Sequence, residues 1–245
     1  MKKKIITVLG TRPEIIRLSC ILRSLDKSFN HEIVNTNQNF SRNLNLNFFK
    51  DLEIKKPKYS MKNSDSKNPI GFISKALIFF DKILEIEKPE AILILGDTNS
   101  SLTAICAKRK KIPIFHLEAG NRCFDQIVPE EINRKIVDHI SDMNLTYSSY
   151  AENNLLREGL DRDLIIKVGS PLKEVYEYYE NKIDKSIILK KLKLQKENFI
   201  IASIHREENV TDKIILHNIL TSINKISKQK KLRVIFSTHP RTLSN

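Results

Sequence analysis

Short runs of Ile, Val, Leu and Phe alternate along this chain with stretches that have the spacing of amphipathic helices. The runs are almost continuously apolar, which is typical of parallel strands buried on both faces. This alternation predicts an α/β fold with helices covering a parallel sheet. The predicted strands are residues 5–9, 32–35, 91–95, 112–115, 144–147, 165–168, 199–204 and 234–237.

Helical periodicity fills most of the intervals between these strands. The predicted helices are residues 14–25, 70–86, 100–108, 130–141, 148–158, 172–181 and 212–227. Residues 53–69 are polar and are predicted to form a loop.

The 245 residues suffice for one large or two small domains. A boundary near residues 169–171 predicts a first domain over 1–169 and a second over 170–245. The second part has only two clear strands and is small for an independent domain. It stops just after a strand and a polar loop, so we expect a second domain that is cut short.

The chain is basic, with a formal net charge of +13. Its lysines are spread along the whole length, and the basic clusters at 108–111 and 228–233 fall where helices should end. No zinc-finger, RRM or helix-turn-helix signature is present. We therefore favour a solvated surface over a nucleic-acid face and expect no nucleic-acid partner.

Three scattered cysteines exclude a disulfide framework and a zinc site, although Cys123 lies in a charged stretch where a reactive thiol is a second interpretation. No apolar run is long enough to span a membrane. The first residues read as a strand and not as a signal peptide, because Arg12 and Glu14 follow at once. We expect a cytoplasmic protein without membrane contact.

Polar motifs follow five of the predicted strands. In open parallel sheets, ligands bind outside the carboxyl ends of the strands, so these loops are expected to line one cleft or two facing edges. The motifs are GTRPE (10–14), GDTNS (96–100), EAGNR (118–122), HREEN (205–209) and THPRT (238–242).

Acids and arginines are most concentrated at residues 116–134. Charges this dense between apolar elements are costly unless they are paired, and they suit a site that moves protons while binding an anion. Taken alone, Asp97 is explained as the N-cap of a helix. It becomes a catalytic candidate because Glu118 follows the next predicted strand along the chain. Two carboxylates at adjacent strand ends can separate each other's pKa values, which makes both catalytic candidates.

The basic candidates have simpler alternatives. Arg12 at a helix start could bind phosphate or be a surface arginine beside a capped helix. Arg134 could form a helical ion pair with Glu130 or Glu131. His205 beside Arg206 favours phosphate contact or proton transfer. GxGxxG, GxxxxGK[ST], HExxH and GxSxG motifs are all missing.

Taken together, the motifs resemble the non-hydrolysing UDP-N-acetylglucosamine 2-epimerase family. The AGNRCFD and HREEN forms resemble its capsule and O-antigen branch, which includes the enzyme that makes UDP-N-acetyl-L-fucosamine. The matching segments are GTRPEIIRL (10–18), GDTNSSLTA (96–104), HLEAGNRCFD (116–125), VPEEINRKIVDH (128–139), LLREG (155–159), GSPLKEV (169–175), HREEN (205–209) and THPRT (238–242).

The resemblance implies a GT-B arrangement of two Rossmann-like domains and an isomerase that inverts C2 of a UDP-2-acetamido sugar, without a nicotinamide cofactor or metal. It implies that UDP is eliminated to give a 2-acetamidoglycal and is then added back. The implied acid–base residues are Asp97, Glu118 and Glu130, with His205 facing the diphosphate. The implied UDP-sugar contacts are Arg12, Arg17, Gln38, Arg122, Arg206 and His239.

The chain departs from the family pattern in two ways. Arg17 stands where a lysine is common, and an arginine is a better anion clamp than proton donor. Family members also continue well past residue 245, into a UDP-binding segment. An inactive remnant and a GT-B glycosyltransferase therefore stay as alternatives, although the latter should lack the set Asp97, Glu118 and Glu130. A homodimer is left open.

Overall fold

The computed structural model describes residues 2–38, 42–62, 68–204 and 207–238. The chain divides into two compact units, Met1–Tyr179 and Glu180–Asn245, and each is described by itself. The functional division at residues 169 and 170 stays a prediction.

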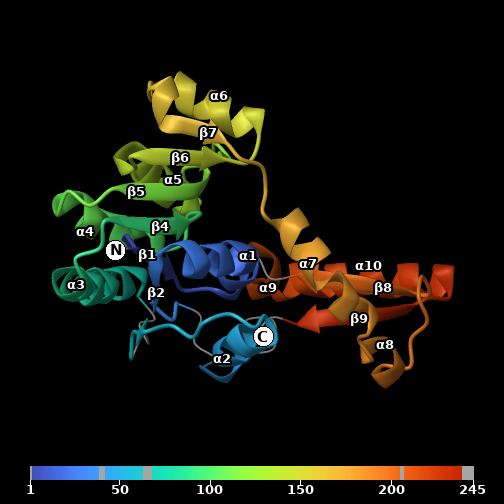
Figure 1. The fold of residues 1–245 in the computed structure, drawn as a ribbon. Coiled ribbons are helices and arrows are strands. Elements are labelled where there is room, and N and C mark those ends of the chain that lie inside the picture. The colour runs from blue at the N-terminus through green and yellow to red at the C-terminus, as the bar shows by residue number, and fades with distance from the viewer. Residues whose placement is uncertain (1, 39–41, 63–67, 205–206, 239–245) are drawn as a thin grey trace. The chain divides into compact units, whose positions relative to one another are not determined.

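The first unit is built on a seven-stranded sheet in the order β3-β2-β1-β4-β5-β6-β7, and every neighbouring pair is parallel (Figure 1). The α/β prediction is confirmed. Strand order reverses between β1 and β4, which is the kind of switch point where open α/β sheets bind ligands. The strands are β1 (Lys4–Leu9), β2 (Asn30–Asn35), β3 (Tyr59–Ser60), β4 (Ala91–Leu95), β5 (Ile114–Ala119), β6 (Met143–Thr146) and β7 (Ile165–Lys167).

Helices connect these strands as the periodicity predicts, but the pattern missed α2 (Arg42–Asp51) and the short helix η2 (Arg162–Leu164). Asn-rich α2 has low helix propensity, but its Phe49 is buried in the core and holds it there. The helical elements are α1 (Arg12–Ser28), α2 (Arg42–Asp51), α3 (Pro69–Glu87), η1 (Ser101–Thr103), α4 (Ala104–Arg109), α5 (Pro129–Ile140), α6 (Ser149–Arg157), η2 (Arg162–Leu164) and α7 (Leu172–Asp184).

The core lies on both faces of the sheet, because successive strand residues point to opposite sides. In β4, Ile92 and Ile94 join the cluster under α3, α4 and α5. Leu93 and Leu95 join the cluster under α1 and α2. This burial on both sides explains why the strands read as continuous apolar runs.

Strand β5 differs from the prediction of 112–115, since it begins two residues later and continues to Ala119. The polar His116 fits inside it because its Nε2 lies 2.9 Å from the Gly96 carbonyl oxygen in the buried interior. Glu118 therefore belongs to the strand end itself and not to the following loop. The predicted loop at 53–69 likewise contains β3.

The second unit carries the parallel pair β8 (Phe199–Ile204) and β9 (Arg233–Thr238), close to the predicted strands. Its helices are α8 (Ile188–Lys191), α9 (Glu207–Thr211) and α10 (Lys213–Lys230). Asp212 caps α10 by accepting a hydrogen bond from the Ile214 amide at 2.8 Å. Within the described ranges, no helix is long and apolar enough to cross a membrane.

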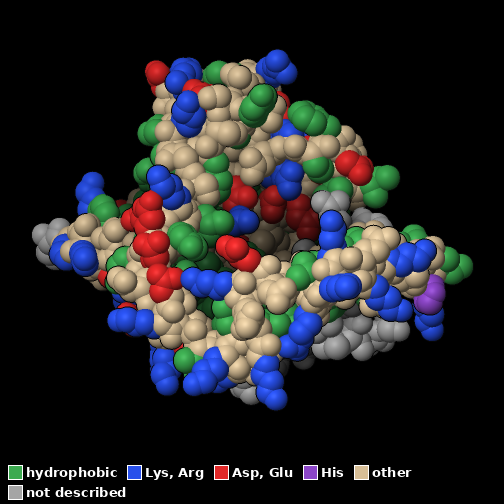
Figure 2. Space-filling view, turned by 90° about the vertical axis from the view of Figure 1, so that its right-hand side faces the viewer, with side chains coloured by type: hydrophobic (Ala, Val, Ile, Leu, Met, Phe, Trp, Pro, Cys, Tyr) green, Lys and Arg blue, Asp and Glu red, His purple; other side chains and the backbone are tan. Residues whose placement is uncertain are grey.

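Lys and Arg side chains are spread over the face shown in Figure 2, with acidic side chains among them. Many of the basic side chains in the described part of the first unit are in ion pairs. Lys108 lies 2.7 Å from Asp142, and Lys110 lies 3.1 Å from Asp81.

Two glycines allow a direct test of the packing between β5 and α6. Gly120 has φ +79°, and a Cβ there would lie 2.3 Å from the Ala151 carbonyl oxygen, whereas Gly159 has φ +85° with nothing within 4 Å. Gly159→Ala should lower the unfolding free energy by about 1–2 kcal/mol through left-handed strain alone. Gly120→Ala should lower the unfolding free energy by about 1–3 kcal/mol more than Gly159→Ala, because the added Cβ overpacks the contact with Ala151. Equal losses in urea unfolding would contradict this packing.

A carboxylate at the end of α3 should make stability depend on pH. Hydrogen bonds from Lys58, Tyr59 and Lys4 lower the pKa of Glu87 from 4.5 to about 2. Because the folded pKa is the lower one, this stabilisation is complete above about pH 4.5 and is lost as pH falls toward 2. Urea unfolding should show a stability gap between wild type and Glu87→Gln that narrows from pH 7 to pH 3. A difference in unfolding free energy that stays constant with pH would exclude Glu87 as a source of the pH dependence.

Candidate active site

The loops after β1, β2 and β4 are locked together at the carboxyl edge of the sheet. A Cβ at Gly10 would lie 2.2 Å from both Ser100 Oγ and Thr36 Oγ1, so only glycine allows this approach. Gln38 Oε1 accepts hydrogen bonds from the Ser100 amide at 3.0 Å and from its hydroxyl at 2.9 Å. Gln38, a predicted ligand contact, thus lies beside the loop of Asp97.

The GTRPE segment begins α1 around a buried carboxylate. Glu14 accepts hydrogen bonds from the amides of Gly10 at 2.7 Å and Thr11 at 2.6 Å, and from the Thr98 hydroxyl at 2.8 Å. Burial raises the pKa of Glu14, and these hydrogen bonds oppose the rise. Arg12, the third residue of the same motif, is exposed, with its guanidinium carbon 5.9 Å from the centre of the Phe48 ring.

Glu118 lies in a strained part of β5. Its φ is +70°, and the register with β6 shifts between Leu117 and Ala119. A non-glycine residue in this conformation costs on the order of 1 kcal/mol and is found where the surrounding structure imposes it. Its carboxylate accepts a hydrogen bond from Arg17 of α1. The irregular backbone therefore coincides with the carboxylate that the sequence singled out.

Burial and two neighbouring charges determine the pKa of Glu118. Burial raises its pKa, the charge of Arg17 lowers it, and the charge of Asp97 raises it again. The charge of Asp97 after β4 therefore acts on Glu118 at the end of β5. Such a pair can divide the roles of proton donor and acceptor.

Asp97 follows β4 and is held by α5. Its Oδ2 accepts a hydrogen bond from Arg134 Nε at 2.9 Å, and its carbonyl oxygen accepts one from Asn133 Nδ2, also at 2.9 Å. Arg134 also lies 3.0 Å from Glu131. The helical ion pair considered from sequence is therefore present, but the same guanidinium also binds Asp97.

The structure brings Asp97, Glu118 and Arg17 together and separates Arg122 from them. The Arg122 side chain is fully buried and lies 2.7 Å from Asp138, while its Nε donates to Glu158 at 2.7 Å. This pairing favours a structural role over direct contact with substrate. Glu130 is exposed in the first turn of α5. The predicted residues His205, Arg206 and His239 lie outside the described residues.

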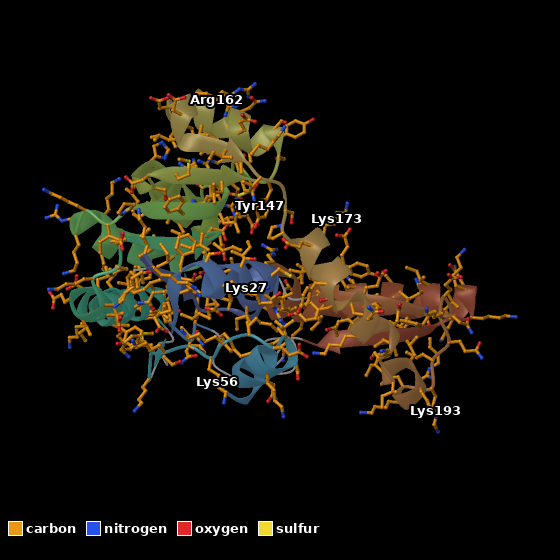
Figure 3. All side chains as sticks on the ribbon, viewed as in Figure 1. Lys27, Lys56, Tyr147, Arg162, Lys173 and Lys193 are labelled. Atoms are coloured by element: carbon orange, nitrogen blue, oxygen red, sulfur yellow. The ribbon has the colours of Figure 1, made fainter. Side chains whose placement is uncertain are left out.

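Tyr147 is a neighbour of this site that the motifs did not reveal. It directly follows β6, and Figure 3 shows it at the end of the sheet. Burial and the charge of Glu118 raise its pKa, while Arg17 lowers it. Its buried hydroxyl has no hydrogen-bond partner in the part of the chain that the structure describes. Its position at the end of the predicted strand 144–147 was the signal that could have found it.

Among the described residues, no group of three or more His, Cys, Asp or Glu side chains could hold a metal ion.

Comparison with known proteins places this architecture. The chain superposes on the Rickettsia bellii UDP-N-acetylglucosamine 2-epimerase structure with a TM-score of 0.90 and 46% identity, covering 100% of this chain and 64% of that one. For the Methanocaldococcus jannaschii UDP-GlcNAc 2-epimerase, in complex with UDP-GlcNAc and UDP, the TM-score is 0.90 at 38% identity over 98% of this chain and 67% of that one. The fold is thus an α/β fold of the GT-B-like class.

A family model described as UDP-N-acetylglucosamine 2-epimerase matches residues 23–245. The UDP-2,3-diacetamido-2,3-dideoxy-D-glucuronate 2-epimerase of Pseudomonas aeruginosa is 32% identical over 98% of this chain and 67% of its own length. The chain belongs to the UDP-N-acetylglucosamine 2-epimerase family. It spans 66% of the length of the curated M. jannaschii relative.

The unpartnered Tyr147 hydroxyl makes a testable contribution to stability. Tyr147→Phe should leave the unfolding free energy unchanged or raise it by about 1 kcal/mol, because an orphaned buried hydroxyl is removed. The matched variant Tyr59→Phe deletes a hydroxyl that donates to Glu87 at 2.5 Å, and should lower it by about 1–3 kcal/mol. A clear loss in Tyr147→Phe in urea unfolding would show that this hydroxyl is bonded.

Proposed function

We propose that this chain is a UDP-sugar 2-epimerase that inverts C2 of a UDP-2-acetamido sugar for surface polysaccharide synthesis. The observation that carries the proposal is the juxtaposition of Asp97 and Glu118, each bound to an arginine, at the carboxyl edge of the sheet. Inversion of a carbon needs a base on one face and an acid on the other, which two carboxylates can supply.

The reaction has two redox-neutral halves. A base takes the C2 proton, the electron pair forms a C1–C2 double bond, and the C1–O bond breaks so that UDP leaves with that oxygen. A proton is then returned to the opposite face of C2 while the UDP oxygen bonds to C1 again. Glu118 and Asp97 are proposed as proton-transfer groups, with Glu130 and His205 assigned by motif.

Departure of UDP leaves negative charge on the diphosphate, which cations must stabilise. Arg12 is exposed at the start of α1, where helix amides also favour phosphate. Arg17 is engaged with Glu118 and would act beside the reacting carbon. The partner is a UDP-sugar, as in the M. jannaschii structure with UDP-GlcNAc and UDP. The P. aeruginosa relative acts on another UDP-sugar by name, so the proposal extends to 2-acetamido sugars generally. A cytoplasmic location stays a prediction.

Hydrogen exchange at C2 tests this proposal directly. The purified chain, given UDP-N-acetylglucosamine or its 6-deoxy talo relative in deuterated water, should place deuterium at C2. Glu118→Gln should slow that exchange by about 100-fold or more, since a positioned acid–base group contributes about 10²–10⁴-fold. Cys123→Ser, which changes an exposed residue of the same segment and supplies a hydroxyl that can donate to Glu131 as the thiol does, should retain it.

Two results would contradict the proposal. Absence of deuterium at C2 together with no binding of UDP in calorimetry would favour an inactive remnant. Transfer of the sugar to an acceptor without C2 exchange would favour a glycosyltransferase.

A further inference from the structure

Glu131 differs from the other acid of its helical turn. Glu130 is exposed in the first turn of α5, as expected for an acid that interacts with the helix dipole. The Glu131 side chain is 0% exposed. A dipole interaction and an (i, i+3) ion pair stabilise a surface carboxylate only weakly. They do not account for a fully buried carboxylate, whose desolvation must be offset by specific partners.

Those partners come from two sources. The Glu131 carboxylate accepts hydrogen bonds from the amides of Cys123 at 3.0 Å and Phe124 at 3.2 Å, and from the Cys123 thiol at 3.3 Å. Arg134 Nη1 donates to it at 3.0 Å. Burial acts to raise the pKa of Glu131, but these contacts outweigh burial and hold the pKa below its ordinary value. The group is therefore built to stay ionised.

Arg134 divides its guanidinium between two carboxylates. Its Nε and Nη2 donate to Asp97 Oδ2, and its Nη1 donates to Glu131. The planar fork fixes the directions of its donors, so anchoring one edge at Glu131 determines where the other edge can meet Asp97. Among the hydrogen bonds and ion pairs of the described residues, Glu131 and Asp97 are linked only through this arginine, so Glu131 would act on Asp97 through it.

We propose that Glu131 is a positioning residue that holds Arg134 on Asp97 and so fixes the orientation of that carboxylate. The inference rests on the proposed function for its catalytic consequence, but the contact itself can be tested without turnover. Since Glu131 also binds the amides of residues 123 and 124, it ties the loop after β5 to the same carboxylate.

The kinetic test uses Glu131→Gln, Asp97→Asn and their double variant in the full chain. Glu131→Gln should lower kcat for C2 exchange by about 10²-fold, the size of loss expected from misplacement of a catalytic group. KM should stay within about twofold, because no substrate contact is removed. The double variant should be no slower than Asp97→Asn alone, since the two residues act as one unit. A double variant whose loss of kcat equals the product of the two single losses would overturn the proposal.

Glu152→Gln is the matched control. Glu152 lies in α6, its side chain is 14% exposed, and it pairs with Arg162 at 2.7 Å. This variant removes the charge from a mostly buried glutamate that pairs with an arginine away from Asp97, and it should leave kcat within about twofold of wild type. A loss of kcat in Glu152→Gln as large as that in Glu131→Gln would attribute both losses to reduced stability and would overturn the proposal.

The second readout is independent of activity. Exchange of the Arg134 Nε–H with water, followed by ¹⁵N NMR, should be at least about tenfold faster in Glu131→Gln and unchanged in Glu152→Gln, because the hydrogen bond to Asp97 is held less firmly. Glu131→Asp keeps the charge and should give an intermediate rate, which supplies a result if Glu131→Gln does not fold. Unchanged exchange would overturn the proposal even if the chain epimerises UDP-sugars. Faster exchange in a chain without C2 turnover would uphold the contact and reject the function.

Discussion

Pairing of charge at the carboxyl edge of the sheet is the constraint on which the site depends. The strands are buried on both faces by apolar contacts, so every loop that leaves them begins beside a low-dielectric core. Carboxylates can be kept there only with cations or amides as partners. Glu118 meets Arg17, Asp97 meets Arg134, and Glu131 meets Arg134 and two backbone amides. The loops are therefore held in place by the same interactions that pair their charges.

Irregular backbone at the same edge supports this arrangement. Glu118 and Gly120 both have positive φ, at +70° and +79°, on either side of Ala119. The glycine adopts this conformation easily and lets α6 approach, while the glutamate needs its surroundings to impose it. The register shift between β5 and β6 redirects the Glu118 side chain toward α1 and Arg17. A regular strand would place alternate side chains on opposite faces and could not gather these groups as closely.

Much of the fold could be predicted from local pattern. Apolar runs of strand length and helical periodicity located the long elements, and the polar motifs after them indicated the functional edge. The errors have physical causes. Helix α2 has poor local propensity and depends on the burial of Phe49. Strand β5 extends past its apolar run because His116 finds a partner in the Gly96 carbonyl. The pairing of Arg122 with Asp138 and Glu158 was likewise not indicated by any motif, since both partners are distant in sequence, and its contact with a UDP-sugar stays a prediction.

By itself, the sequence determined the strand–helix alternation, the position of polar motifs after the strands and the family. These follow from periods of two and 3.6 residues and from short contiguous motifs, which consecutive residues encode. Only the tertiary structure decided which charges meet. Arg17 and Glu118 are 101 positions apart, and Arg134 and Asp97 are 37 apart. Parallel strands bring their carboxyl ends to one edge, so partners distant in sequence become neighbours there, and no local pattern specifies which of them will pair.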